Sequence, residues 1–138
     1  MQPLAVITDT AIDLAMLRAH VTVDDHGAVA EFSGLVRNHD HGKAVTELEY
    51  QIHPDAQAAL SDILQRHALL HPDTRIAAAH RHGLLQIGDV AFAAIVSSAH
   101  RDLAFQVLRD VVEAVKAELP IWKRQQFADG SHEWVNFA

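Results

Sequence analysis

The residues best suited to chemistry in this 138-residue chain lie in one stretch, 97–124. His100 and Arg101 stand near its start, and Lys116 and Lys123 near its end. Imidazolium, guanidinium and ammonium groups bind and stabilise anions through charge-assisted hydrogen bonds. The chain as a whole carries a net charge of −7. A local group of cations in an acidic protein therefore predicts a site for a small anion.

The start of this stretch is typical of a helix N-terminus. The serines at positions 97 and 98 are good N-cap residues, and the free N–H groups of a first helical turn attract anions. Arg101 adds a planar fork that matches phosphate or carboxylate. The alternative is that Arg101 pairs with Asp102 or Glu113 on the surface and that His100 is a solvated cap.

The end of the stretch carries two amines. An apolar stripe at helical spacing predicts a helix that Pro120 ends, which leaves Lys116 in its last turn and Lys123 beyond it, next to Trp122. Two converging amines would lower each other's pKa and leave one usable as a base or nucleophile. The alternative is that Lys116 has no catalytic role and occupies the last turn because a cation is stabilised at the negative end of the helix dipole.

A further cation follows an expected strand over residues 28–36. Gly34 inside that strand indicates a bulge or a close approach to the backbone, and Arg37 at the strand end is well placed to clamp an anion. The polar, turn-rich segment 38–44 predicts an exposed, mobile loop directly after Arg37.

The eleven histidines raise the question of a metal site. His39 and His41, and likewise His80 and His82, are two residues apart and would share a face of a strand. Nearby carboxylates supply no obvious third and fourth ligand. We therefore expect surface histidines, with no metal and no cofactor.

The elements that must position these residues alternate between strand and helix along the chain. Helices are expected over about 10–19, 54–71 and up to residue 119, with strands over 4–8, 28–36, 45–52, 74–80, 83–89, 90–96, 121–124 and 133–137. The continuous apolar run 90–96 predicts a central strand buried on both faces, and the Asp129-Gly130 pair predicts a hairpin turn. The expected fold is α+β in one domain, 1–138, with a mostly antiparallel sheet, two to three helices and a smaller β lobe.

The amino-acid composition argues against several classes of protein function. Acidic residues outnumber basic ones 18 to 11, which argues against a nucleic-acid or membrane-surface binder because such partners need a broad basic face. With no cysteine, any sulfur chemistry requires sulfur from outside. Without a long apolar run or a leader-like N-terminus, we expect a cytoplasmic protein.

Five motifs in order along the chain carry a resemblance to a known family. They are Phe32-Ser33-Gly34-Leu35-Val36-Arg37-Asn38-His39, Leu48-Glu49-Tyr50, His80-Arg81-His82-Gly83-Leu84-Leu85, Ser97-Ser98-Ala99-His100-Arg101 and Pro120-Ile121-Trp122-Lys123-Arg124, the last preceded by Lys116. Together they resemble the large, catalytic subunit of molybdopterin synthase.

The resemblance implies an α/β hammerhead fold and a homodimer within a heterotetramer. It also implies a small sulfur-carrier subunit whose C-terminal Gly-Gly tail enters the active site as a thiocarboxylate. The implied reaction installs two dithiolene sulfurs on cyclic pyranopterin monophosphate in molybdenum cofactor biosynthesis, which makes the protein a sulfurtransferase. An anionic substrate suits the local cations, and an external donor suits the lack of cysteine.

Site residues follow from the same resemblance. The implied substrate-binding set is Leu35, Val36, Arg37, His100, Arg101, Lys116, Lys123, Arg124 and Gln125. Within it, Lys116 and Lys123 are the implied catalytic pair, with Lys116 for acid/base work or for engaging the carrier's terminal carbonyl and Lys123 for charge stabilisation. The chain departs from the family pattern at Gln125, where Glu is frequent, and at Ile52-His53.

Two questions stay open at this level. A helix of this length separates its two cationic ends by ~20 Å, so either substrate and carrier tail span that distance or a neighbouring subunit supplies one end. The rival functions are a non-catalytic module that docks a ubiquitin-like sulfur carrier and a histidine-dependent metal hydrolase.

Overall fold

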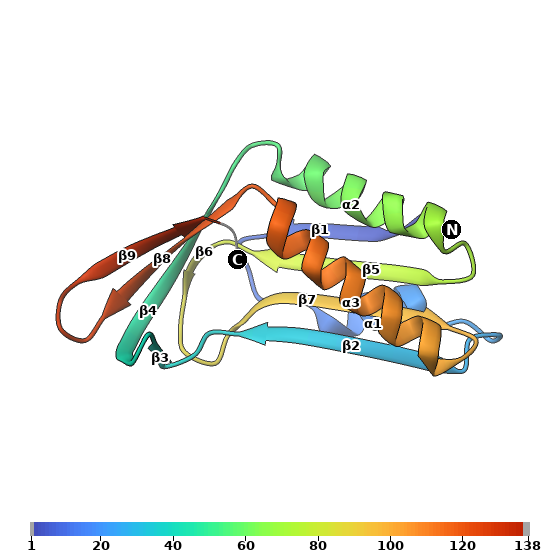
Figure 1. The fold of residues 1–138 in the computed structure, drawn as a ribbon, viewed down its shortest axis with the longest axis horizontal. Helices are drawn as coiled ribbons and strands as arrows, with labels where there is room; N and C mark the ends of the chain where they lie inside the picture. Colours follow the sequence, from blue (N-terminus) through green and yellow to red (C-terminus); the bar gives the residue numbers. More distant parts are fainter. Residues whose placement is uncertain (1, 137–138) are drawn as a thin grey trace.

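The computed structural model describes residues 2–136 and contains two sheets and three helices in that range (Figure 1). The strands are β1 (Leu4–Thr8), β2 (Ala28–Leu35), β3 (His39–Asp40), β4 (Lys43–Ile52), β5 (Arg75–Arg81), β6 (Gly83–Leu85), β7 (Val90–Ser98), β8 (Ile121–Phe127) and β9 (His132–Asn136). The helices are α1 (Leu14–Val21), α2 (Ala56–Leu70) and α3 (Arg101–Glu118). Phe137, which was expected to end the last strand, lies outside the described residues.

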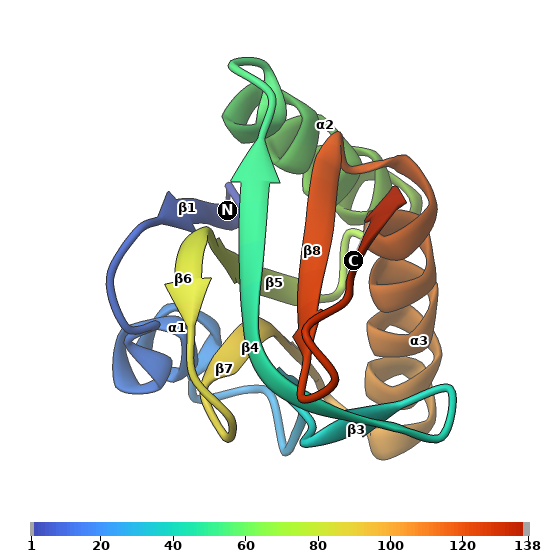
Figure 2. The same cartoon turned by 90° about the vertical axis from the view of Figure 1, so that its left-hand side faces the viewer.

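The larger sheet has the strand order β1-β5-β7-β2. Only its β1–β5 pair is parallel, while β5–β7 and β7–β2 are antiparallel. The second sheet joins β3, β4, β8 and β9, with β6 paired to β4, and all its pairings are antiparallel (Figure 2). The predicted α+β fold with a mostly antiparallel sheet and a smaller β lobe is therefore confirmed.

Strand β7 is buried along almost its whole length because helices cover both faces of its sheet. Ala93 and Ile95 pack with α1, whereas Phe92, Ala94 and Val96 belong to the main core with α2 and α3. Alternate residues thus enter two separate apolar layers, and both must be apolar. This explains the continuous hydrophobic run, and the predicted central strand is confirmed.

Helix α3 connects the two sheets. Its buried stripe of Val107, Val111, Val112 and Val115 packs in the main core, and it ends at the C-cap residue Leu119, directly before Pro120. Strand β8 begins immediately afterwards at Ile121. The short connection places the C-terminal end of α3 beside the smaller sheet and leaves its N-terminal end at the far side of the larger sheet (Figures 1 and 2).

Three local predictions need correction. Helix α1 starts later than expected, at Leu14, because Asp13 is the N-cap and its side chain accepts a 3.1 Å hydrogen bond from the Met16 N–H. Segment 38–44 is a short hairpin rather than a plain loop, since β3 pairs with β4 around a turn at His41 and Gly42.

The serines at 97 and 98 are the third correction. They end β7 and are fully buried, and the N-cap of α3 is His100, which makes no side-chain capping bond. The Ser97 hydroxyl donates to the Val21 carbonyl, and the Ser98 hydroxyl donates to the His100 carbonyl. These hydroxyls satisfy backbone acceptors where the strand meets the helix, so they are not free to bind an anion.

Candidate active site

The two lysines come together at the end of α3. Lys116 lies in the last turn of the helix, and Lys123 lies on β8. Between them the Pro120 carbonyl accepts a 3.1 Å hydrogen bond from the His53 N–H, which ties the turn to the end of β4. The chain reversal brings both amines within electrostatic range of each other.

Lys123 has a perturbed pKa. Partial burial lowers its pKa from the ordinary value of a lysine, and the positive charges of Lys116 and Arg37 lower it further. The carboxylates of Asp40 and Glu133 act in the opposite direction. We call these five residues, together with Gln125, the lysine group. Its ammonium at position 123 gives up a proton more readily than a free lysine does, which suits a residue that handles charge during a reaction.

Arg37 joins the lysine group from the end of β2. The strand bulges between Gly34 and Leu35, as the glycine predicted. Val36 is buried and makes two backbone bonds, 3.0 Å to Asp89 and 2.9 Å from Gly88, so the backbone preceding Arg37 is fixed. The Arg37 guanidinium itself is 65 % exposed and pairs with Asp40 at 3.2 Å, which leaves it accessible to a ligand.

The remaining predicted residues in this region face different ways. Gln125 is buried, and its amide donates hydrogen bonds to Asp40 at 2.6 Å and to Glu133 at 3.4 Å. Because side chains alternate along a strand, Arg124 lies on the other face of β8, where it pairs with Glu49 at 3.5 Å. Leu35 is 55 % exposed next to the bulge.

His80 is a residue that sequence reasoning missed. We expected His80 and His82 to be surface histidines, but His80 is fully buried at the end of β5, stacked on Phe92 and edge-on to Tyr50. Its Nδ1 lies 2.8 Å from the Arg81 carbonyl and must donate to it, so Nε2 carries a lone pair and has no partner.

Burial lowers the pKa of His80 to about 4, and Lys116 adds to the effect. A neutral imidazole with an unpaired acceptor therefore lies within electrostatic range of Lys116. Its position at the end of an apolar, alanine-rich strand is the sequence signal that indicates burial.

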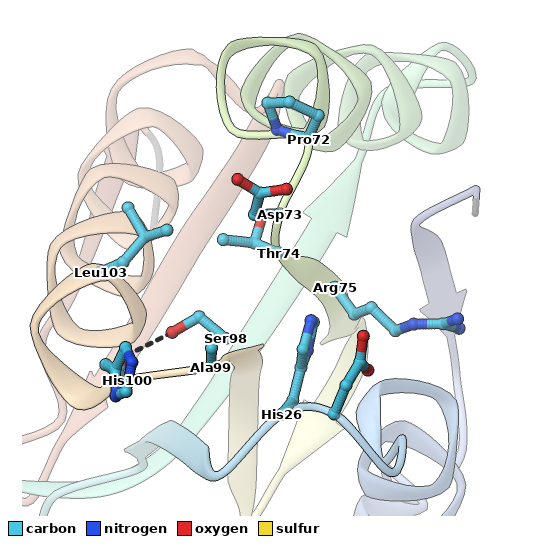
Figure 3. Close-up of a pocket in the computed structure, with 10 residues that line it drawn as sticks. His26, Pro72, Asp73, Thr74, Arg75, Ser98, Ala99, His100 and Leu103 are labelled. Atoms are coloured by element: carbon cyan, nitrogen blue, oxygen red, sulfur yellow. Dashed lines mark hydrogen bonds between the residues drawn. The ribbon is translucent and has the colours of Figure 1, made fainter.

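The second group of predicted residues lies at the other end of α3. His100 and Arg101 border an open hollow whose lining is completed by Gly27, Ala28, Ala99 and Asp102. His100 also lines a cavity of about 520 Å³ (Figure 3). The other residues of that cavity are Asp25, His26, Pro72, Asp73, Thr74, Arg75, Ser98, Ala99 and Leu103.

Arg101 is exposed and forms no ion pair within residues 2–136, so neither of the expected surface partners, Asp102 or Glu113, holds it. The first turn of α3 also presents unbonded backbone N–H groups. This end of the helix can accept an anion.

A single chain does not bring the two groups together. Arg101 is the first residue of α3, and Lys116 follows it by fifteen residues on the same helix. At 1.5 Å per residue the two are ~20 Å apart along the axis. One subunit therefore presents two half-sites, not one pocket.

The described residues contain one group that could hold a metal ion, formed by Asp40, His41 and Glu133. His39 is not part of it, because its Nδ1 lies 2.9 Å from the Asn38 side-chain oxygen. Both carboxylates of the group already accept hydrogen bonds from Gln125 and lie near Lys123. Neighbouring positive charge and occupied acceptors make this arrangement a poor fit for a cation.

The fold and the two groups define a class, an α+β protein with cationic half-sites that suit an anionic substrate. Over residues 7–118 the chain matches the family model described as MoaE protein. It is 37 % identical to molybdopterin synthase catalytic subunit 1 of Mycobacterium tuberculosis, covering 96 % of this chain and 90 % of that protein. It is 35 % identical to the molybdopterin synthase catalytic subunit of a Nostoc species, covering 92 % and 79 %.

Solved structures agree. Molybdopterin synthase from Staphylococcus aureus superimposes with a TM-score of 0.87 at 32 % identity, covering 99 % of this chain and 98 % of that one. A protein–protein complex of subunits 1 and 2 of the Helicobacter pylori molybdopterin-converting factor has the same fold, with a TM-score of 0.71 at 20 % identity.

The chain belongs to the MoaE family. The family and the function class predicted from the sequence motifs, that of a molybdopterin synthase catalytic subunit, are thereby confirmed. No helix within residues 2–136 is long and apolar enough to cross a membrane.

Proposed function

We propose that this protein transfers sulfur from the C-terminal thiocarboxylate of a small carrier subunit to cyclic pyranopterin monophosphate, forming the dithiolene of molybdopterin. The observation that supports this most is the lysine group. Arg37, after the end of β2, and Lys116, on α3, both lie within electrostatic range of Lys123 on β8 in a chain of net charge −7.

The lysine group suits the sulfur-donating half of the reaction. Delivery of sulfur converts the carrier's terminal thiocarboxylate into a carboxylate, with water supplying the oxygen, so negative charge develops on the carbonyl oxygen as water adds to the carbonyl carbon. Preorganised cations at such a position stabilise the transition state. We assign acid/base work at the carrier's terminal carbonyl to Lys116 and charge stabilisation to Lys123.

The helix-start group suits the substrate. His100 and Arg101 stand where free backbone N–H groups and the positive end of a helix dipole favour a phosphate. We assign the phosphate and pterin to these two residues and to Arg37, with Leu35 and Val36 lining the approach. Gln125 forms a wall of the pocket, whereas Arg124 lies on the other face of β8 and acts through its pair with Glu49.

We further propose that a dimer completes the active site. The ~20 Å between Arg101 and Lys116 exceeds what one small pocket spans. A second copy of the chain that places its helix-start group over the first copy's lysine group removes this mismatch. With a carrier subunit at each outer end, the assembly is a heterotetramer of a homodimer and two carriers.

Two further predictions concern the domain organisation of the chain and its location in the cell. Residues 1–138 form one domain, a prediction favoured by a main core that joins Leu48 and Ile121 of the smaller sheet to Ile76 and Phe92 of the larger. The protein works in the cytoplasm, which cell fractionation checks.

Reconstitution tests the proposal. The purified chain, its thiocarboxylated carrier and the precursor should together yield molybdopterin, and omission of either partner should abolish it. Carrier binding without turnover would favour the docking module instead. Stoichiometric metal in the purified protein, together with hydrolase activity that a chelator removes, would favour the metal hydrolase.

A further inference from the structure

Asp40 occupies the centre of the lysine group. Its side chain is only 16 % exposed, although it lies in the short β3–β4 hairpin at the edge of the smaller sheet. One carboxylate oxygen pairs with the Arg37 guanidinium at 3.2 Å. The other accepts a 2.6 Å hydrogen bond from the Gln125 amide. Asp40 thus connects the end of β2 to the middle of β8 through two separate contacts.

Gln125 fixes the position of that carboxylate. Its amide is buried, and it also donates a longer bond, 3.4 Å, to Glu133 on the neighbouring strand β9. The Gln125 hydrogen bond is the main cause that lowers the pKa of Asp40 below its usual value, so the side chain is a carboxylate at neutral pH. A fixed negative charge therefore stands near the cations Arg37 and Lys123.

We propose that Asp40 is a positioning residue of the sulfur-transfer site, which holds Arg37 over the pocket and keeps the neighbouring Lys123 in its charged form. Its role in turnover rests on the proposed function, whereas its effect on Lys123 does not. The Arg37 side chain remains 65 % exposed while it is paired with Asp40, so a phosphate or carboxylate can reach the guanidinium in the position where Asp40 holds it.

Several charged or titratable groups act on Lys123, and they differ in sign. They are Asp40 and Glu133, which raise the pKa of Lys123, and Lys116 and Arg37, which lower it. Asp40 is the larger of the two acidic influences, and Lys116 and Arg37 oppose it. Tyr50 is the strand partner of Lys123 on β4, and burial raises its pKa to about 12, so it is neutral at working pH. Loss of the Asp40 charge leaves the repulsion from Lys116 and Arg37 with weaker compensation.

The chain permits a direct test because it has three lysines, Lys43, Lys116 and Lys123. NMR of 13C-labelled lysine side chains follows each titration separately in the free protein. In Asp40→Asn, an isosteric change that removes the charge, we expect the pKa of Lys123 to fall further below the ordinary value of a lysine. Lys43 is the strand partner of Asp40 and pairs with Asp129, so its titration is recorded in the same spectra, and the unaltered protein is the reference. Asp40→Glu retains the charge and should restore Lys123 to its value in the unaltered protein.

Turnover provides the second readout. The alkaline limb of the kcat profile should move to lower pH in Asp40→Asn, and KM for the anionic precursor should rise because Arg37 is no longer held over the pocket. The control is Asp129→Asn, which removes a 3.5 Å ion pair with Lys43 at the opposite end of the β8–β9 hairpin and should move neither quantity.

An unchanged Lys123 titration in Asp40→Asn would overturn the proposal. A fall in kcat accompanied by lower thermal stability and an unmoved alkaline limb would also reject it, because those changes indicate a purely structural role. If the unaltered protein transfers no sulfur, the proposed function fails, and the lysine titration still decides what Asp40 does to Lys123.

Discussion

Arg101 and Lys116 stand at opposite ends of one helix, fifteen residues apart, and no fold of a single chain can bring them into one pocket. The helix is straight through this region (Figure 1) and its rise sets their separation at ~20 Å. Lys116 comes within electrostatic range of Lys123 because Pro120 ends the helix and β8 begins directly after it. The same helix that assembles one half of the site therefore holds the other half away from it.

Replacement of Lys116 by alanine should remove catalysis. Loss of a positioned acid/base group costs on the order of 100-fold or more in rate, so we expect kcat to fall at least that far in the reconstituted reaction. Lys43→Ala is the matched control, because Lys43 is an exposed lysine that pairs with Asp129 outside the lysine group. Turnover close to the unaltered rate in Lys116→Ala would remove Lys116 from the mechanism.

Arg37 and Arg101 should act on substrate affinity. A hydrogen bond to a charged group contributes about 1.5–3 kcal/mol, so Arg37→Ala or Arg101→Ala should weaken precursor binding by roughly ten- to hundredfold. Arg109→Ala, which removes an exposed arginine halfway along α3, should leave affinity unchanged. Calorimetric titration with the precursor measures all three, and equal affinities would reject the phosphate assignment.

His80 should make the fold sensitive to acid. Its folded pKa of about 4 lies below the value of about 6.5 in an unfolded chain, so the unfolded state binds more protons between these limits. Stability therefore falls as pH is lowered from about 6.5 to about 4, by on the order of 3 kcal/mol from this residue. His80→Phe keeps an aromatic ring next to Phe92 and should show a smaller loss of Tm between pH 7 and pH 4.5.

The exposed His132 provides the control for that measurement, because His132→Gln should lose as much Tm as the unaltered protein does. Equal losses in His80→Phe and in the unaltered protein would show that His80 does not set this dependence.

Much of the fold could be predicted from local pattern. The apolar run at 90–96, the stop at Pro120 and the bulge at Gly34 each depend on one physical cause that sequence displays directly. The N-cap of α3 could not be predicted this way. Serine caps a helix or ends a strand equally well, and the choice was decided by the Val21 carbonyl, which Ser97 reaches across 76 residues of sequence.

The candidate site likewise contains residues that could be predicted from the sequence and residues that could not. Motifs identified the cations, since their residue types and order along the chain are visible in sequence. The burial of His80 and the carboxylates around Lys123 depend on pairings between distant strands, such as Asp40 with Gln125. A bulge between Val45 and Glu47 also shifts which side chains of β4 face inward, so Val45 is buried where simple alternation favours Thr46.

The most direct test of the account is activity in mixed dimers. One subunit carries Lys116→Ala, the other carries Arg101→Ala, and different affinity tags isolate the mixed species, which is assayed with thiocarboxylated carrier and precursor. If each active site combines Lys116 of one subunit with Arg101 of the other, the mixed dimer contains one intact site. It should then retain about half of the activity of the unaltered dimer. The two homodimers, which carry Lys116→Ala or Arg101→Ala in both subunits, should both be impaired. A mixed dimer no more active than these homodimers would contradict a shared site.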